Sequence, residues 1–146
     1  MGGYGTLITS IKHPEMFVAC AAFSAAVLSD DEVLAETQQQ WDKVFGPAFG
    51  AKAKGNERLT DHLKENSPLR ILRQAGAADA LKGVRLYIDC GDDDFLYKGN
   101  ALLHIALREL KIPHEYRVRD GGHTWSYWRS GLPDALKFIG VSFHQP

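Results

Sequence analysis

The sequence predicts an α/β fold, with parallel strands and helices packed on both faces of the sheet. Three short segments, 16–24, 84–90 and 114–119, have the composition of strands, and segments with helical signals separate them. Strands that alternate with helices form βαβ units, in which the strands run parallel. The first segment is apolar throughout, which is typical of a strand that is covered on both faces.

Helix signals in the first half of the chain lie on either side of the first strand. A helix is expected over 3–12, because apolar residues share one side of it and a proline follows its end. Ser29 and Glu32 form a capping box that starts a second helix. Glycine and proline at 46–47 are expected to end that helix. The segment 46–59, rich in Gly, Ala and Lys, is expected to be a surface loop.

Helices are also expected between and after the other two strands. Ser67 is a suitable N-cap and Pro68 a suitable first helical residue, and Gly76 is expected to end that helix. Apolar residues recur at helical spacing in the longer segments that follow. The helices expected in this half cover 60–65, 67–76, 98–111 and 132–143.

Composition excludes several classes of protein. The chain has 146 residues, of which 45% are hydrophobic and 24% charged, with a net charge of −1. These values are close to those of soluble domains, about 45–50% apolar and about 25% charged, so one soluble domain is expected. The sequence has no cluster of Lys and Arg of the kind that binds nucleic acid, so a nucleic-acid partner is not expected. No apolar run approaches the roughly 20 residues of a membrane span. Cys20 and Cys90 lie in apolar runs and are expected to be buried free thiols.

Two polar loops follow the second and third expected strands. One holds Asp92, Asp93 and Asp94, and the other is Gly121–His123. Ligands bind at the carboxyl ends of parallel strands, so both loops are expected on one edge of the sheet. An acid followed by a histidine is the order of these residues in one class of hydrolytic triad. A histidine after a strand is also often structural, and each of Asp89, Asp92, Asp93 and Asp94 fits the acid position.

The density of acids at 92–94 raises the question of a divalent cation. Their spacing does not fit an EF-hand, and no second ligand segment is evident in the sequence. We therefore expect no metal site.

Two longer motifs resemble those of the putative-esterase family of α/β-hydrolases. They are Ile-Asp-Cys-Gly-Asp-Asp-Asp-Phe-Leu at 88–96 and Gly-Gly-His-Thr-Trp-Ser-Tyr-Trp-Arg at 121–129. The family's motifs are typically Cys-Gly-x-x-Asp-Phe-Leu and Gly-Gly-His-x-Trp-x-x-Trp. The family includes feruloyl and acetyl-xylan esterases, S-formylglutathione hydrolases, enterochelin esterases and mycolyltransferases. The resemblance covers essentially the whole chain and implies the C-terminal portion of an α/β-hydrolase fold.

The resemblance implies a role for particular residues. Asp94 matches the acid of the triad and His123 the base. Trp125 and Trp128 fit a substrate pocket beside the histidine, although core packing would also explain them. Met1 begins Met-Gly-Gly-Tyr-Gly, the second half of the family's nucleophile elbow, Gly-x-Ser-Met-Gly-Gly-Tyr-Gly. The nucleophilic serine is therefore expected immediately before Met1, whose backbone N–H would be one oxyanion donor.

These matches lead to an expectation for the whole protein. Residues 1–146 would be a single α/β-hydrolase domain, truncated at its N-terminus, so that the early strands, the nucleophile and any signal peptide lie outside it. The parent would be a serine carboxylic-ester hydrolase without a cofactor, acting on small-molecule or carbohydrate esters, with acetyl or feruloyl groups favoured. The alternative is a non-catalytic fragment or binding remnant. An open sheet edge at the first strand would also allow a homo-oligomer.

Overall fold

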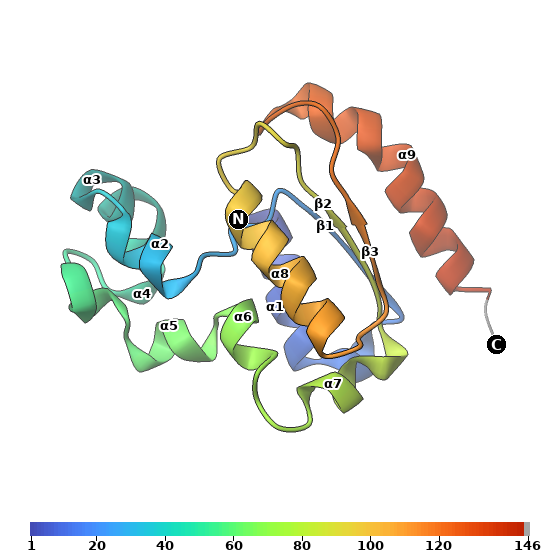
Figure 1. Ribbon diagram of the computed structural model, residues 1–146, viewed down its shortest axis with the longest axis horizontal. Coiled ribbons are helices and arrows are strands. Elements are labelled where there is room, and N and C mark those ends of the chain that lie inside the picture. Colours follow the sequence, from blue (N-terminus) through green and yellow to red (C-terminus); the bar gives the residue numbers. More distant parts are fainter. Residues whose placement is uncertain (145–146) are drawn as a thin grey trace.

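A computed structural model describes residues 1–144 and contains one parallel sheet (Figure 1). Its strands are β1 (Ala19–Phe23), β2 (Arg85–Asp89) and β3 (His114–Arg117). They lie in the order β1-β2-β3, and both neighbouring pairs are parallel. The predicted α/β class with parallel strands is therefore confirmed.

Helices and helical turns connect and flank the strands. Those longer than ten residues are α1, α8 and α9, and short helices fill the connection between β1 and β2. The helical elements are α1 (Gly2–Lys12), η1 (Pro14–Met16), α2 (Asp30–Ala35), α3 (Gln38–Gln40), η2 (Trp41–Phe45), α4 (Gly46–Phe49), η3 (Gly55–Arg58), α5 (Asp61–Glu65), α6 (Pro68–Ile71), α7 (Ala77–Ala80), η4 (Leu81–Gly83), α8 (Tyr97–Glu109) and α9 (Trp125–Ser142).

The two faces of the sheet pack against different helices. Successive strand residues point to opposite faces. Cys20, Ala22 and Ile88 belong to the main core, which also includes apolar residues of α1 and α8. On the other face, Phe23 and Tyr87 pack with α9. Figure 1 shows the same arrangement, with α9 on one side of the sheet and α1 and α8 on the other. Helices thus cover both faces, as predicted.

The region between β1 and β2 differs most from the prediction. The capping box of Ser29 and Glu32 is present and starts α2, but this helix ends at Ala35. Thr37 then caps α3, which continues into a π-helical turn, η2. The Gly-Pro pair at 46–47 does not end the helical path. It begins α4, because a proline in the first turn of a helix loses no hydrogen bond there.

The predicted surface loop over 46–59 is also partly helical and is anchored by a buried arginine. Arg58, at the end of η3, donates hydrogen bonds to the carbonyl oxygens of Ala53, Val33 and Glu36 at 3.2, 3.1 and 2.7 Å. These bonds tie η3 to α2 over a small separate core. That core consists of Ala26, Val33, Trp41, Phe45, Phe49, Leu63 and Leu96.

Three other predicted boundaries are wrong by several residues. The strand expected over 16–24 is shorter: Met16 belongs to η1, Phe17 is the C-cap of that turn, and Ser24 leaves the extended conformation with a positive φ. Gly76 does not end α6 but precedes α7 in a left-handed conformation, with φ of +85°. The helix expected over 132–143 begins at Trp125, because the hydroxyl of Thr124 accepts a hydrogen bond from the N–H of Tyr127 at 3.3 Å and caps it.

The sheet has β1 at one edge. β1 pairs with β2, and no strand of the part that the structure describes pairs with its other side.

Among residues 1–144, no helix combines the length and apolar character needed to cross a membrane. Cys20 and Cys90 are buried free thiols, as predicted.

Candidate active site

The loops that follow β2 and β3 lie against each other at the carboxyl edge of the sheet. The backbone N–H groups of Asp92 and Asp93 donate to the carbonyl oxygens of Arg119 and Gly121, each at 3.1 Å. Gly91 comes so close to Gly121 that a Cβ at position 91 would lie 1.9 Å from the Gly121 carbonyl oxygen. Backbone pairing therefore continues from the strands into the loops, and the two polar loops share one edge, as predicted.

Asp94 and His123 meet where these two loops touch. Nδ1 of His123 lies 3.0 Å from Oδ2 and 3.2 Å from Oδ1 of Asp94. The Asp94 side chain is fully buried, and Oδ1 also accepts the backbone N–H of Leu96 at 2.9 Å. A carboxylate only accepts hydrogen bonds, so Nδ1 carries the proton and Nε2 is the free ring nitrogen. The His123 side chain is 30% exposed, in contrast to the buried Asp94.

Two of the neighbouring acids, Asp89 and Asp92, hydrogen-bond to other groups. Asp89 is buried and binds Arg119 and Tyr127. Asp92 accepts the backbone N–H of Gly121 at 3.0 Å. Within the described residues, Asp94 is the acid whose carboxylate hydrogen-bonds to His123. The geometry thus separates the four acids that the sequence left as alternatives.

Two aromatic side chains pack against the His123 ring. The Phe95 and Trp128 rings each have their centroid 4.8 Å from that of His123, Phe95 tilted and Trp128 edge-on. Sequence reasoning missed Phe95, although it directly follows Asp94 in the acid motif. It also missed Ser24, whose hydroxyl accepts a hydrogen bond from the indole N–H of Trp128 at 2.9 Å.

An apolar hollow adjoins these aromatic residues. Trp125 packs edge-on against Trp128 with centroids 5.2 Å apart, and it is 71% exposed. Phe23, Arg129 and Leu132 complete the lining. The structure therefore places Trp125 at the surface of this hollow rather than in the core, with Trp128 between it and His123.

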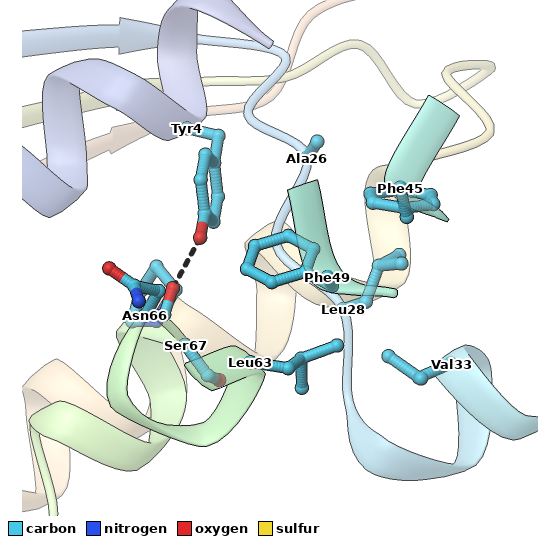
Figure 2. Close-up of a pocket in the computed structure, with 10 residues that line it drawn as sticks. Tyr4, Ala26, Leu28, Val33, Phe45, Phe49, Leu63, Asn66 and Ser67 are labelled. Atoms are coloured by element: carbon cyan, nitrogen blue, oxygen red, sulfur yellow. Dashed lines mark hydrogen bonds between the residues drawn. The ribbon is translucent and has the colours of Figure 1, made fainter. Parts of the chain in front are cut away.

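A different apolar cavity lies between α1 and the short helices, and Figure 2 shows its lining. Tyr4 reaches across it and donates its hydroxyl proton to the backbone carbonyl of Asn66, beside Phe49 and Leu63. The cavity measures about 30 Å³, which is room for roughly one or two water molecules. Neither Asp94 nor His123 lines it, and its volume is too small for an ester substrate.

Three exposed acids gather beside the paired loops. Carboxylate oxygens of Asp92, Asp93 and Asp120 lie within 4.8 Å of one another. Asp120 supplies the second segment that the sequence did not reveal, because the contact arises only when the loops pair. Exposed acidic groups commonly cluster without an ion, so this group alone identifies no metal site.

The amino end of α1 lies at the same edge of the sheet. A Cβ on Gly3 would lie 2.5 Å from the carbonyl oxygen of Phe23, at the end of β1. The next residue, Ser24, accepts a hydrogen bond from the indole of Trp128, and the Trp128 ring contacts the ring of His123. The first turn of α1, which begins after Met1, is therefore linked by direct contacts to the surroundings of His123.

A family model described as "Putative esterase" matches residues 1–139. The chain belongs to this esterase family. The resemblance carried by the acid and histidine motifs is thus confirmed over nearly the whole chain.

Individual relatives agree with the family. The esterase-family chain is 26% identical over 147 residues to an acetyl esterase of Caldicellulosiruptor saccharolyticus, covering 95% of this chain and 51% of that protein. It is 33% identical to a ferulic acid esterase structure, with a TM-score of 0.73 and coverage of 97% and 49%. The S-formylglutathione hydrolase FrmB of Staphylococcus aureus shares the fold at 24% identity, with a TM-score of 0.71 and coverage of 95% and 51%. The chain spans about half the length of these relatives.

Proposed function

We propose that this esterase-family chain carries the base and the acid of a serine carboxylic-ester hydrolase. His123 acts as the general base, and Asp94 orients its ring and stabilises the imidazolium that forms. The observation that carries the proposal is the contact between Nδ1 of His123 and the buried Asp94 carboxylate, which leaves Nε2 as the free ring nitrogen. Burial of Asp94 favours this arrangement, because its carboxylate is shielded from competing water.

The proposed nucleophile is a serine immediately before Met1. The match of residues 1–5 to the second half of the family's nucleophile elbow supports this position. The contact of Gly3 with the end of β1 also supports it, because that contact brings the amino end of α1 to the edge where His123 lies. In the described residues, no serine hydroxyl hydrogen-bonds to the His123 ring.

The proposed reaction proceeds in two halves. Nε2 of His123 takes the serine proton while the hydroxyl oxygen attacks the ester carbonyl, and the same proton then goes to the leaving alcohol. In the second half, Nε2 of His123 takes a proton from water while the water oxygen attacks the acyl carbonyl. The bond to the serine oxygen then breaks, the same proton returns to that oxygen, and the carboxylic acid leaves. The backbone N–H of Met1 would donate to the oxyanion from the amino end of α1, where the helix dipole also favours negative charge. A second donor would come from a segment that precedes the serine.

We infer acetyl or feruloyl esters of carbohydrate as the substrate class. Two relatives are named acetyl esterase and ferulic acid esterase, the latter 33% identical. The hollow lined by Phe23, Trp125 and Trp128 suits an apolar or aromatic part of an ester, because aromatic rings pack favourably against one another.

Kinetics of substituted proteins test the proposal. The assay uses the polypeptide extended by the residues that precede Met1 in the same reading frame, with p-nitrophenyl acetate and methyl ferulate as substrates. Asp94→Asn should lower kcat about 10⁴-fold and His123→Ala at least as much. Asp93→Asn, in the same loop, is the matched control and should stay within about twofold.

Either of two results would reject the assignment. One is near-normal hydrolysis by the Asp94→Asn or His123→Ala protein. The other is the lack of an in-frame Gly-x-Ser before Met1, which would favour the non-catalytic alternative.

A further inference from the structure

A second buried acid lies beside the proposed acid–base pair and is bound by three side chains. Asp89, the last residue of β2, has a fully buried side chain. Arg119 donates to it from Nη2 at 3.1 and 3.2 Å and from Nε at 3.3 Å. The hydroxyls of Tyr127 and Tyr87 donate to it at 2.6 and 3.3 Å.

The members of this network flank both loops of the candidate site. Asp89 stands just before the loop that carries Asp94. Arg119 stands just before His123, and Tyr127 lies in the first turn of α9, just after it. The network therefore joins the two loops from their strand ends and from the helix that follows.

Arg119 is itself held on several sides. Its guanidinium lies 4.1 Å from the centre of the Tyr127 ring, and Nη1 donates to the hydroxyl of Ser130 at 2.8 Å. Burial alone lowers the pKa of Arg119, but hydrogen bonding and the charge of Asp89 outweigh burial and raise it. Burial, and then the hydrogen bond to Asp89, raises the pKa of Tyr127. Both side chains therefore stay protonated donors at neutral pH.

We propose that Asp89, Arg119 and Tyr127 are positioning residues that set the geometry between Asp94 and His123. The proposal rests on the proposed function for its catalytic meaning. In physical terms, the network fixes the distance between the loop that carries Asp94 and the loop that carries His123. An acid–base pair works only within narrow tolerances of distance and angle, and buried hydrogen bonds between supporting residues supply that restraint.

A purely structural role of the network predicts something different. A buried ion pair that merely stabilises the fold would lower global stability when weakened, without a selective effect on His123. The two tyrosines separate these cases, because both donate to Asp89 but only Tyr127 lies on the segment that carries His123.

The test follows the His123 ring by NMR in the 146-residue chain, so it needs neither a nucleophile nor a substrate. The readouts are the ¹⁵N shifts of the ring, which report the tautomer, and the exchange rate of the Nδ1 proton held by Asp94. We expect Tyr127→Phe to speed this exchange about tenfold, the order of effect of losing one hydrogen bond to a charged group. Tyr87→Phe should change it by less than about twofold.

Three results decide the matter. A folded Tyr127→Phe protein with unchanged His123 signals overturns the proposal, and so do equal effects of the two tyrosine variants. If Tyr127→Phe does not fold, Ser130→Ala decides. That variant removes an exposed support of Arg119, and it should speed exchange about threefold or more, whereas an unchanged rate overturns the proposal. If the proposed serine nucleophile proved wrong, these NMR results would still test the positioning role, because they do not depend on the serine.

Discussion

The indole N–H of Trp128 donates a hydrogen bond to the hydroxyl of Ser24, with 2.9 Å between Nε1 and Oγ. Ser24 is buried directly after β1 and has a positive φ of 44°. Trp128 lies in the first turns of α9 and contacts the ring of His123. This one bond therefore joins the end of the edge strand to the helix that follows the candidate base.

Removing that bond should cost measurable stability. Trp128→Phe keeps an aromatic ring but leaves the buried Ser24 hydroxyl without its donor, so we expect a loss of about 1–3 kcal/mol in the free energy of unfolding. Urea denaturation followed by circular dichroism measures it. Trp125→Phe, at a side chain that is 71% exposed, is the matched control and should stay within about 0.5 kcal/mol. Equal losses for the two variants would contradict the role given to the bond.

The two cysteines should be unreactive in the folded chain. Burial raises the pKa of Cys20 to about 11 and that of Cys90 to about 12. At pH 8 roughly one thiol in a thousand or fewer is then the reactive thiolate. We expect a thiol reagent such as DTNB to modify neither residue in buffer within minutes and both in urea. Fast labelling of the native chain would refute this.

Stability should fall on mild acidification because of a histidine pair at the opposite end of the sheet. Nδ1 of His104 lies 2.8 Å from Nε2 of His114, and the His104 ring stacks on Tyr116. Burial, and then the charges of His114 and Arg108, lowers the pKa of His104 below its unfolded value of about 6.5. The folded state thus binds fewer protons than the unfolded state near that pH.

The resulting stability is fully present above about pH 6.5 and is lost as the pH falls through the lowered pKa of folded His104. Urea midpoints measured between pH 7.5 and 5 should therefore decline, and His104→Gln should flatten the decline. His144→Gln, at an exposed position, is the control and should keep the original slope. A slope unaffected by His104→Gln would show that the pair is not responsible.

The outer edge of β1, which pairs with no strand among residues 1–144, should promote self-association of the 146-residue chain. The N–H of Ser24 and the carbonyl of Val18 bond to β2, so the backbone groups of Ala19, Ala21 and Phe23 point to the other side. Unpaired edges of this kind invite pairing with another chain. We expect sedimentation to reveal concentration-dependent association that Ala21→Pro weakens, because proline removes an outward donor without breaking the pairing with β2. A monomer at all concentrations would contradict the expectation.

Local signals explain which parts of the fold could be predicted. Ser29 and Glu32, three positions apart, form a capping box by themselves. The apolar composition of β1 and β2 also differs clearly from that of the flanking segments. The meeting of Asp94 and His123 could be anticipated for a different reason. Each ends a loop after a parallel strand, and such loops gather at one edge.

The features that could not be predicted depend on long-range contacts. Arg58 is buried because carbonyl groups of α2 converge on it, and nothing near it in the sequence shows this. In the sequence, nothing distinguishes Asp89 from the acids of the loop that follows it. Its hydrogen bonds to Arg119 and Tyr127 arise only from the tertiary structure. The exposed acid Asp120 likewise joins Asp92 only through loop pairing.

Locating the reactive serine tests the central claim most directly. The extended polypeptide is treated with a fluorophosphonate, which phosphonylates an activated serine, and the adduct is mapped by mass spectrometry. We predict one adduct, on the residue immediately before Met1, that disappears in His123→Ala, and no adduct on the 146-residue chain. Stoichiometric labelling of any serine within residues 1–146, or labelling that does not depend on His123, would contradict the account.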